Sequence, residues 1–547
     1  MRRLPLVVVV IALAAAVGIT AVATGGRPFA SPGSSSGASP SSPIIAGEPS
    51  GSAPLATAGG STPIPGGSAS EPPVDAPLAD VPIVPVAQFR TTVRSVTRAD
   101  FVATVEGRSA RWDALELVES EAPAILAALR VEIPAGSSDL VLVKDATTLS
   151  RDLAAHRKRL GVLRADVVRP SVRALAWGGH QLFGVDAVDS VAAWGLTARL
   201  PQPVDTPIFD PSASWTLVAG GDIMLDRGVA QTLTLKGKGA DFAFDGGTAE
   251  ITGTCKDCSP LGWDTPYTRR TGNGGAVRHL IESADIAIAN FENPAPDAYR
   301  YHTSGTVFSA NPKLIAGLAN AGIDWVGLAN NHIRDAGGPG ILQTIANLKK
   351  YGIRSSGAGK DLKAARTPAI LEAGGVKVAF LAYDTIAKAY GAGADRVGSA
   401  QMSAPALRAD VAAARKAGAG VVIVFPHWGT EYDPTPFGGQ QALARAAIDA
   451  GADMVIGNHA HWAGAVEVYK GRPIWYALGN FVFDQTWSIP TMEGITLELT
   501  FRGKTLVQAR MRPHIILDKA QPNFLDPAGS GRFVMGQVFD ASKGLPW

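Results

Sequence analysis

The sequence predicts an α/β protein, and three features of the chain support this fold class. After Trp215, short runs of apolar residues alternate with longer stretches of helical composition. Runs that are apolar on both faces are typical of parallel strands covered by helices. Several helical stretches end in glycine directly before the next run, as left-handed helix C-caps require, at Gly322, Gly352, Gly418 and Gly451.

Composition sets the scale and excludes several classes of protein. The 547 residues, 46% hydrophobic and 18% charged, allow two to four domains at roughly 150 residues each. Lys+Arg 50 against Asp+Glu 48 argues against a nucleic-acid binder that works by bulk charge, so we expect no nucleic-acid partner. Two cysteines exclude a disulfide-dense scaffold and a four-cysteine zinc module.

The chain begins with its one apolar run long enough to cross a bilayer, which excludes a polytopic membrane protein. Leu4 to Thr24 carries no charge and follows Arg2 and Arg3, so we expect the rest of the chain to be exported. Residues 1–24 are predicted to be either a signal peptide cleaved after Ala21-Val22-Ala23 or an uncleaved anchor across ~30 Å of hydrocarbon. The protein would then be anchored in the cell membrane facing outside, or secreted. No cysteine directly follows the run, which excludes a lipoprotein anchor.

Three further segments flank or precede the main domain. Residues 25–85, rich in Gly, Pro, Ser and Ala, are predicted to form a disordered linker because they cannot bury enough apolar surface to offset the entropy of ordering. Residues 86–204 are predicted to form a small α/β accessory domain, with a strand at Leu140–Val143 and a helix over Ala165–Ala176. The main domain is placed at residues 212–515 and a C-terminal tail at 516–547.

Seven apolar runs are predicted to be strands of the main domain, and five stretches between them to be helices. The runs are Thr216–Ala219, Ile286–Ala289, Trp325–Leu328, Val376–Ala382, Val421–Phe425, Met454–Ile456 and Ile474–Leu478. The helices are Ala276–Ser283, Pro312–Ala321, Gly340–Tyr351, Ala404–Ala417 and Gln440–Ala450. The pattern predicts a largely parallel sheet. Gly494–Asp518 alternates apolar and polar residues, which predicts antiparallel edge strands.

Metal-ligand and catalytic residue types follow five of these runs. Because the carboxyl ends of parallel strands share one edge, the loops should converge there. The side chains concerned are Asp222, Glu292, Asn331, His332, His427, His459 and His461.

This donor set predicts a centre of divalent metal ions. Imidazole, carboxylate and amide oxygen without thiolate favour Mn, Fe or Zn. Seven candidates exceed the needs of one ion and suit two ions ~3.5–4 Å apart with a bridging carboxylate. In an extended His-x-His, the imidazoles of His459 and His461 would share a face. Taken singly, each motif also has a structural interpretation, such as a turn with a helix cap.

At these residues the sequence resembles the CapA family, bacterial capsule-synthesis proteins linked to poly-γ-glutamate, within the calcineurin-like metallophosphoesterase superfamily. The motifs that carry the resemblance are Gly221–Met224, Asn290–Glu292, Ala329–His332 with Asp335–Gly337, His427–Tyr432, Gly451–His461 and Leu478–Asp484. The resemblance implies a four-layer α-β-β-α sandwich.

The resemblance also implies a role for each site residue. Asp222 and His461 would bind the first metal, Glu292 would bridge, and Asn331, His427 and His459 would bind the second. His332 would protonate the leaving group or stabilise charge in the transition state, with Asp335 as the second catalytic residue of that motif.

One position departs from the pattern. Phosphoesterases usually carry His two residues after the first Asp, where this chain has Met224. Thioether is a poor ligand for Mn or Zn, so the first metal would be weakly held, recruit Asp226, or be absent.

Two further groups of residues are candidates. Cys255 and Cys258 are expected to form a short disulfide outside the cytoplasm, with a redox CxxC and a zinc site as the less favoured alternatives. Arg269, Arg270 or Arg334 could hold anionic groups of a substrate.

The sequence leaves three functions open. The first is a metal-dependent hydrolase or transferase acting on a cell-surface polymer, through either a γ-glutamyl amide or a phosphoester. The second is a non-catalytic assembly factor that works with capsule-synthesis membrane proteins. The third is a generic metallophosphoesterase.

Overall fold

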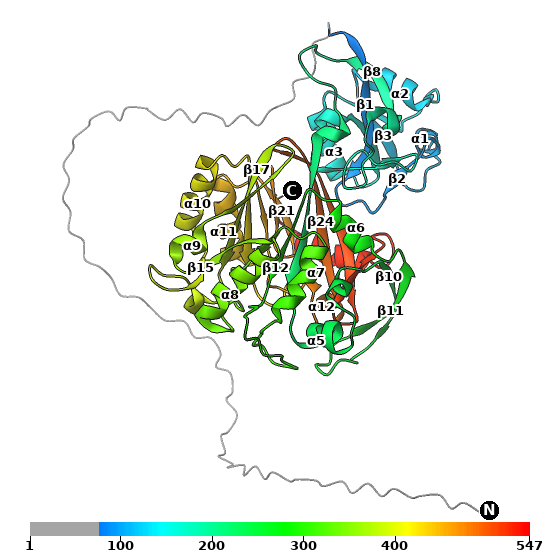
Figure 1. Ribbon diagram of the computed structural model, residues 1–547. Coiled ribbons are helices and arrows are strands. Elements are labelled where there is room, and N and C mark those ends of the chain that lie inside the picture. Colours follow the sequence, from blue (N-terminus) through cyan, green and yellow to red (C-terminus); the bar gives the residue numbers. More distant parts are fainter. Residues whose placement is uncertain (1–75, 547) are drawn as a thin grey trace, which may run out of the picture. The chain divides into compact units, whose positions relative to one another are not determined.

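The computed structural model describes residues 76–546 (Figure 1). The apolar run at 4–24 and most of the expected linker lie outside the described residues. Within 76–546, no helix combines the length and the apolar composition that a membrane crossing needs.

The first folded part is built on a six-stranded mixed sheet. Its strands follow the order β4-β3-β5-β1-β6, and β8 also pairs with β1. The strands are β1 (Leu78–Gln88), β3 (Ala114–Val118), β4 (Leu140–Val143), β5 (Arg159–Arg164), β6 (Val172–Ala174) and β8 (Thr197–Pro201). The helices are α1 (Arg98–Val105), α2 (Ala122–Leu129), α3 (Ala146–Ala155) and α4 (Val191–Trp194). The short strands β2 (Ser95–Val96) and β7 (Ala176–Trp177) form a separate pair.

Two boundaries in this part differ from the sequence predictions. β1 begins at Leu78, inside the segment predicted as linker up to residue 85, because Val81, Ile83 and Val84 are buried in the core of this part. The predicted helix over Ala165–Ala176 is wrong. Only Ala165–Val167 forms a 3₁₀ turn, and the chain then enters β6, where Val172 pairs with Gln88 of β1.

The second folded part contains two larger sheets. The ten-stranded sheet has the order β11-β10-β26-β25-β24-β9-β12-β13-β14, with β23 paired to β9. Its strands are β9 (Ser214–Ile223), β10 (Thr248–Cys255), β11 (Thr265–Gly272), β12 (Ile286–Phe291), β13 (Trp325–Gly327), β14 (Arg354–Ser356), β23 (Asn480–Val482), β24 (Glu493–Arg502), β25 (Thr505–Leu517) and β26 (Gln521–Leu525).

The six-stranded sheet has the order β16-β17-β19-β20-β22-β21. Its strands are β16 (Ala369–Ala373), β17 (Val376–Asp384), β19 (Val421–His427), β20 (Met454–Ile456), β21 (Val466–Tyr469) and β22 (Arg472–Trp475). The helices of this part include α6 (Ala276–Glu282), α7 (Ile315–Asn320), α8 (Gly337–Lys350), α10 (Ala404–Lys416), α11 (Gly438–Asp449) and α13 (Arg532–Ala541).

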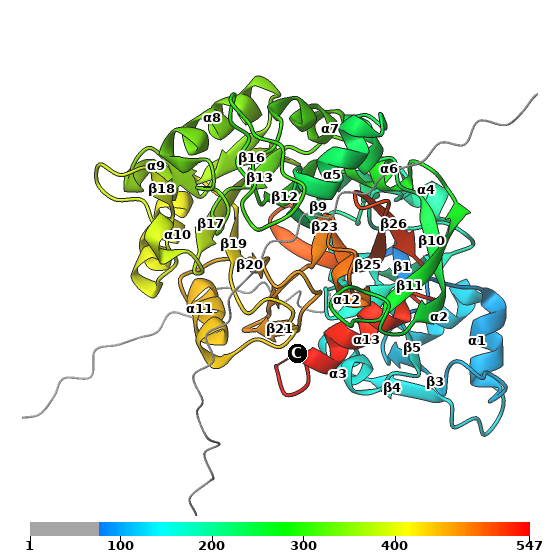
Figure 2. The same cartoon turned by 90° about the horizontal axis from the view of Figure 1, so that it is seen from below.

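One hydrophobic core joins the facing sides of the two large sheets. The ring of Trp325 from β13 stacks on Phe380 of β17 at 4.9 Å and meets Phe425 of β19 edge-on at 5.1 Å. Successive residues of β19 alternate in the way a strand requires: Ile423 joins this core, whereas Val424 joins a second core with α10 and α11. The ten-stranded sheet shares a third core with α6, α7 and α8 (Figure 2). Both faces of β19 are therefore covered.

Each of the seven apolar runs lies in or overlaps a strand, but they do not belong to a single, largely parallel sheet. β9, β12 and β13 lie in the ten-stranded sheet, and β17, β19, β20 and β22 lie in the other. The ten-stranded sheet is mixed, because β24 runs antiparallel to β9.

The ends of the main domain also differ from the prediction. β24 and β25 are interior strands rather than edges, because β26, β10 and β11 continue the sheet beyond them. β26 and α13 lie in the segment predicted as tail, and Val534, Met535 and Val538 of α13 complete the core between the sheets. All four predicted cap glycines have positive φ, from 82° to 101°.

Candidate metal centre

The site lies where the carboxyl ends of β9, β12 and β19 and the loop after β20 come together. Asp222 is the penultimate residue of β9 and pairs in register with Asn290 of the parallel β12, so Glu292 emerges beside it. His427 is the last residue of β19. The parallel β20 ends at Ile456, and His459 and His461 follow it. The predicted convergence of these segments is therefore observed, although it involves two sheets.

Two groups of three side chains have the geometry of metal ligands. Glu292, His427 and His459 form one group, and Asp222, Glu292 and His461 form the other; in each group the ligand atoms lie within 4.8 Å of one another. Glu292 belongs to both groups. Its Oε1 lies 3.5 Å from His427 Nε2 and 3.9 Å from His461 Nε2.

Glu292 gives the strongest indication that a cation belongs here. The residue is fully buried, and neither carboxylate oxygen accepts a hydrogen bond from any described residue. Burial raises the pKa of Glu292 well above its usual value, and the nearby carboxylate of Asp222 raises it further. A buried carboxylate without a partner is costly, whereas divalent cations between Glu292 and the imidazoles would satisfy both of its oxygens. The residues present therefore fit such ions.

The histidines are held in the form that binds metal. Burial lowers the pKa of His427 and His461 well below the usual value and that of His459 to about 3, so all three imidazoles are neutral at pH 7. Neutral imidazole is the metal-binding form. Burial raises the pKa of Asp222 to about 7, against hydrogen bonds from Asn290 Nδ2 (2.7 Å) and the backbone N–H of His459 (3.2 Å).

Three asparagines orient the ligand side chains. Asn331 Oδ1 lies 2.8 Å from His427 Nε2, which places this amide with the group formed by Glu292, His427 and His459. Asn290 and Asn480 were not predicted as site residues. Asn290 Nδ2 contacts both Asp222 and His427, and Asn480 Oδ1 lies 2.9 Å from His461 Nδ1. Asn290 lies at the end of β12 and Asn480 at the start of β23, on the same sheet edge as the ligands. This position was the feature that could have identified them as site residues.

The His-x-His segment has a different backbone from the one expected. His459 and His461 have φ values of 93° and 56°, in the left-handed region, rather than an extended conformation. Positive φ is costly for residues with a Cβ and is concentrated at functional sites. The two imidazoles reach the same carboxylate, Glu292, because the loop turns twice and not because a strand alternates.

His332 lies beside both groups, with one ring nitrogen held and the other facing the centre. Its Nδ1 contacts Asp335 Oδ2 at 2.9 Å, and its Nε2 lies 4.0 Å from Glu292 Oε1. The ring of Phe308 lies over the imidazole with centroids 4.2 Å apart, and the Phe308 N–H donates to the same Asp335 oxygen. The two predicted catalytic residues therefore form a unit aimed at the metal groups.

Comparison with known proteins assigns the family. The model of the bacterial capsule synthesis protein PGA_cap matches residues 216–485. Capsule biosynthesis protein CapA of Bacillus anthracis is 31% identical over 292 residues, which cover 51% of this chain and 70% of that protein. A probable polyglutamine synthesis accessory protein of Mycobacterium tuberculosis (strain ATCC 25618 / H37Rv) is 33% identical over 310 residues, 53% of this chain and 78% of that protein.

The chain belongs to the CapA family. Among solved structures, a 5'-nucleotidase precursor from Thermus thermophilus covers 60% of this chain and 58% of its own at 12% identity and a TM-score of 0.33. The NAD nucleotidase of Haemophilus influenzae covers 61% and 56% at 12% identity and a TM-score of 0.31. At these scores neither likeness carries an argument about the CapA-family site.

Met224 stands where phosphoesterases usually have a histidine ligand, and in this CapA-family protein no neighbouring described residue takes the place of that ligand. Met224 is fully buried in the core against α6–α8, and its sulfur accepts the Asp226 N–H at 3.0 Å. Asp226, the predicted replacement, instead accepts hydrogen bonds from the backbone N–H and ring of His302 and from the Ser309 N–H. The carboxylate of Asp226 therefore holds the 302–309 loop, and the group with Asp222 keeps three protein ligands.

The predicted arginines pair with groups away from the ligand atoms. On β11, Arg269 pairs with Glu250, and Arg270 pairs with Asp518. Arg334 donates to the carbonyl of Val397 at 2.6 Å. Among the described contacts, none joins these guanidinium groups to the two ligand groups, and their role in substrate binding stays a prediction.

Arg227 is a nearby cation that the sequence analysis missed. Its guanidinium lies 4.8 Å over the Phe308 ring and pairs with Asp484, and its charge offsets a small part of the rise in the pKa of Glu292 that burial causes. Arg227 directly follows Asp226 in the segment after β9, and this position could have identified it as a residue near the site.

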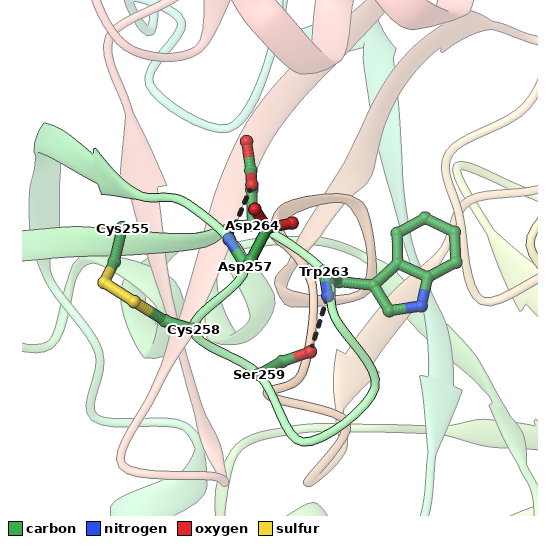
Figure 3. The surroundings of a disulfide bond; sticks show 6 residues. All are labelled: Cys255, Asp257, Cys258, Ser259, Trp263 and Asp264. Carbon is green, nitrogen blue, oxygen red and sulfur yellow. Dashed lines mark hydrogen bonds between the residues drawn. A yellow bond between two sulfur atoms is a disulfide. The ribbon is translucent and has the colours of Figure 1, made fainter.

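Cys255 and Cys258 form the predicted disulfide in the turn between β10 and β11 (Figure 3). The Asp257 N–H donates to Asp264 Oδ1 at 3.1 Å, and the Trp263 N–H donates to Ser259 Oγ at 2.9 Å, which closes the turn. Trp263 then meets Trp462, the neighbour of His461, edge-on at 5.7 Å.

Proposed function

We propose that this protein is an exported, metal-dependent hydrolase or transferase that acts on an anionic cell-surface polymer, with poly-γ-glutamate as the first candidate. The observation that carries the proposal is the buried Glu292 carboxylate, unpaired among the described residues and facing imidazoles on both sides. The names of the relatives, a capsule biosynthesis protein and a polyglutamine synthesis accessory protein, support a role in making a cell-surface polymer, and the choice of poly-γ-glutamate follows the family resemblance.

Two ions of Mn, Fe or Zn would be held by the two ligand groups. Asp222, Glu292 and His461 would hold the first, and Glu292, His427 and His459, with the Asn331 amide oxygen, the second. When bound, such a pair supplies Lewis acidity at the scissile group and activation of water, and both an amide and a phosphoester pass through an anionic centre that cations stabilise.

The residues of the chain supply the proton and the orientation. His332 donates a proton from Nε2 to the leaving nitrogen or oxygen. Asp335 accepts from Nδ1, so the imidazole keeps one orientation with Nε2 towards the metal groups. Asn290 and Asn480 hold Asp222 and His461 in place, so the first ligand group is preorganised.

The rest of the proposal concerns architecture and location. The two facing sheets and the helices outside them would form the four-layer α-β-β-α sandwich of metallophosphoesterases, and residues 1–24 would direct export and anchor the chain unless cleaved. The Cys255–Cys258 disulfide supports export, because disulfides persist in oxidising compartments. Capsule-synthesis membrane proteins would be partners.

One observation favours a second candidate, a non-catalytic assembly factor of a capsule machine. The group with Asp222 has only three protein ligands because Met224 lies in the core and Asp226 is engaged elsewhere. If this group held no ion, the bridging role of Glu292 would be lost.

Metal content and turnover test these candidates together. We expect the full-length protein, loaded with Mn or Zn, to bind close to two ions per chain by mass spectrometry of the metal and to shorten poly-γ-glutamate. Glu292→Gln should lose both properties. Glu372→Gln, a substitution of an exposed glutamate on β16, is the matched control and should keep them.

Three results would overturn the proposal in different ways. Full turnover in Glu292→Gln would exclude the metal mechanism. Less than one ion per wild-type chain would favour the assembly factor. Hydrolysis of aryl phosphates with none of the polymer would favour a generic phosphoesterase.

A further inference from the structure

A cavity of about 330 Å³ opens on the other side of the strand end that carries His427. Thr385, Lys388, Trp428, Phe437, Gln440 and Leu443 are among its lining residues. It is tied directly to the metal centre, because the Thr385 N–H donates to the His427 carbonyl at 3.1 Å and Trp428 follows His427 in the chain. The cavity and the metal centre therefore share one backbone segment.

Gln440 is a largely buried residue whose side-chain amide has no hydrogen-bond partner among residues 76–546. The residue is 5% exposed and lines the cavity. A Cβ added at Gly429 would lie 3.0 Å from Gln440 Nε2, so this amide rests against the His427–Gly429 segment. Because Gln440 also lines the cavity, a ligand bound there could supply the hydrogen bonds that this amide lacks.

The same cavity receives the start of helix α11. The helix begins at Gly438, and its N-cap residue Phe437 supplies no side-chain hydrogen bond. The first N–H groups of a helix have no partner within it and form the positive end of its dipole. Gly439 and Gln440 of this first turn line the cavity. Lys388 adds a positive charge, and within the described range its ammonium has no ion pair.

The acidic residue in the wall is already satisfied. Asp384 Oδ1 accepts from the N–H groups of Ile386 (2.7 Å) and Ala387 (3.3 Å), and its Oδ2 lies 3.3 Å from Ser399 Oγ and from Gln401 Nε2. The charge left for a ligand is thus that of Lys388, the first N–H groups of α11 and the Gln440 amide add donors, and the flanking surfaces of Trp428, Phe437 and Leu443 are apolar.

We infer that this cavity is a second anion subsite, which binds a carboxylate of the polymer one or more units away from the group held at the metal centre. This inference rests on the proposed function. It names the contact by which the enzyme would prefer a polymer over a single monomer unit. Consecutive side chains of an extended segment point to opposite sides, so His427 faces the metal groups and Trp428 faces the cavity. A polymer that crosses this edge presents carboxylates to both sides, and its methylene groups suit the apolar walls.

The test is binding of penta-γ-glutamate to the full-length protein kept metal-free with chelator, measured by calorimetry. Without metal, the signal reports the subsite rather than the catalytic centre. We expect Gln440→Leu and Lys388→Met each to weaken binding at least fivefold. The pentamer with its α-carboxylates converted to amides should bind at least tenfold more weakly than penta-γ-glutamate.

Two controls keep the result specific. Lys416→Met removes the same charge from an exposed position at the far end of α10 and should bind as the wild type does. Gln440→Leu should not lower the midpoint of thermal unfolding, because it removes an amide that has no partner in the fold. A lower midpoint would show that this amide has a structural partner and would overturn the inference.

Other outcomes also decide the matter. Unchanged binding in Gln440→Leu and Lys388→Met overturns the subsite, as does failure of the wild type to bind the pentamer. Equal displacement by inorganic phosphate and by glutarate overturns the assignment to carboxylate. The proposed function is judged separately, by turnover of poly-γ-glutamate in the metal-loaded wild type, so either can fail without the other.

Discussion

Glu498 on β24 is the fully buried carboxylate through which the accessory part meets the ten-stranded sheet. Its Oε1 accepts the Val185 N–H at 3.0 Å and lies 3.6 Å from Arg510 Nη1, and its Oε2 accepts from Arg512 Nε at 2.6 Å. Burial by itself would raise its pKa, but the guanidinium groups of Arg512 and Arg510 outweigh burial and lower the pKa to about 2 from 4.5.

Glu498→Gln should therefore destabilise the protein substantially. The difference between 4.5 and 2 corresponds to about 3 kcal/mol of interaction with the ionised carboxylate. Breaking a buried ion pair from one side costs about 3–5 kcal/mol, which agrees, since Arg510 would stay buried without its counter-charge.

The sign of the pH dependence follows from the lowered pKa. The folded pKa lies below the unfolded one, so the stabilisation is complete above pH 4.5 and is lost as the pH falls towards about 2. Urea unfolding followed by tryptophan fluorescence, at pH 7 and at intervals between pH 4.5 and 2, should show a loss of about 3 kcal/mol in Glu498→Gln at pH 7. Between pH 4.5 and 2, the free energy of unfolding of the variant should also fall less steeply than that of the wild type.

The matched control is Glu119→Gln, a substitution of an exposed glutamate in the accessory part, which should change the free energy of unfolding by less than about 0.5 kcal/mol. A loss below about 1 kcal/mol in Glu498→Gln at pH 7, or an equally steep fall in variant and wild type at acid pH, would refute the reasoning that this carboxylate is ionised and paired in the folded protein.

Three further predictions concern the metal centre. Gly221→Ala should unfold or strongly destabilise the protein in thermal scans, because the added Cβ would lie 1.9 Å from the Gly479 carbonyl oxygen; a stable variant would contradict this backbone approach. Asp335→Asn should keep the metal content and lower kcat for the polymer about 10²-fold or more, since His332 loses the carboxylate that accepts from Nδ1 and holds its orientation, and unchanged kcat would remove Asp335 from the mechanism. Mn or Zn at 100 times its Kd should raise the free energy of unfolding by about 2.7 kcal/mol per site in urea titrations. Glu292→Gln should abolish the rise, and a rise of equal size in that variant would place the ions elsewhere.

Local sequence patterns anticipated much of the fold because they report burial. Runs such as Val421–Phe425 are apolar on both faces, and the structure buries both faces of β19. The pattern could not assign each strand to a sheet, since a strand with two covered faces has the same composition in either one. It also missed β1 from Leu78, where the valines and isoleucine stand among prolines typical of a linker.

The sequence by itself determined the donor set of the centre, because these side chains directly follow the carboxyl ends of parallel strands, and the two sheets bring those ends together. Only the tertiary structure decided what those donors do: that Glu292 is shared by two ligand groups, that His459 and His461 meet it through left-handed backbone, and that Asp226 is occupied by the 302–309 loop. These outcomes depend on which distant segments supply hydrogen bonds and exclude water. Such contacts are set by the packing of the whole chain and leave no periodic signal in the sequence.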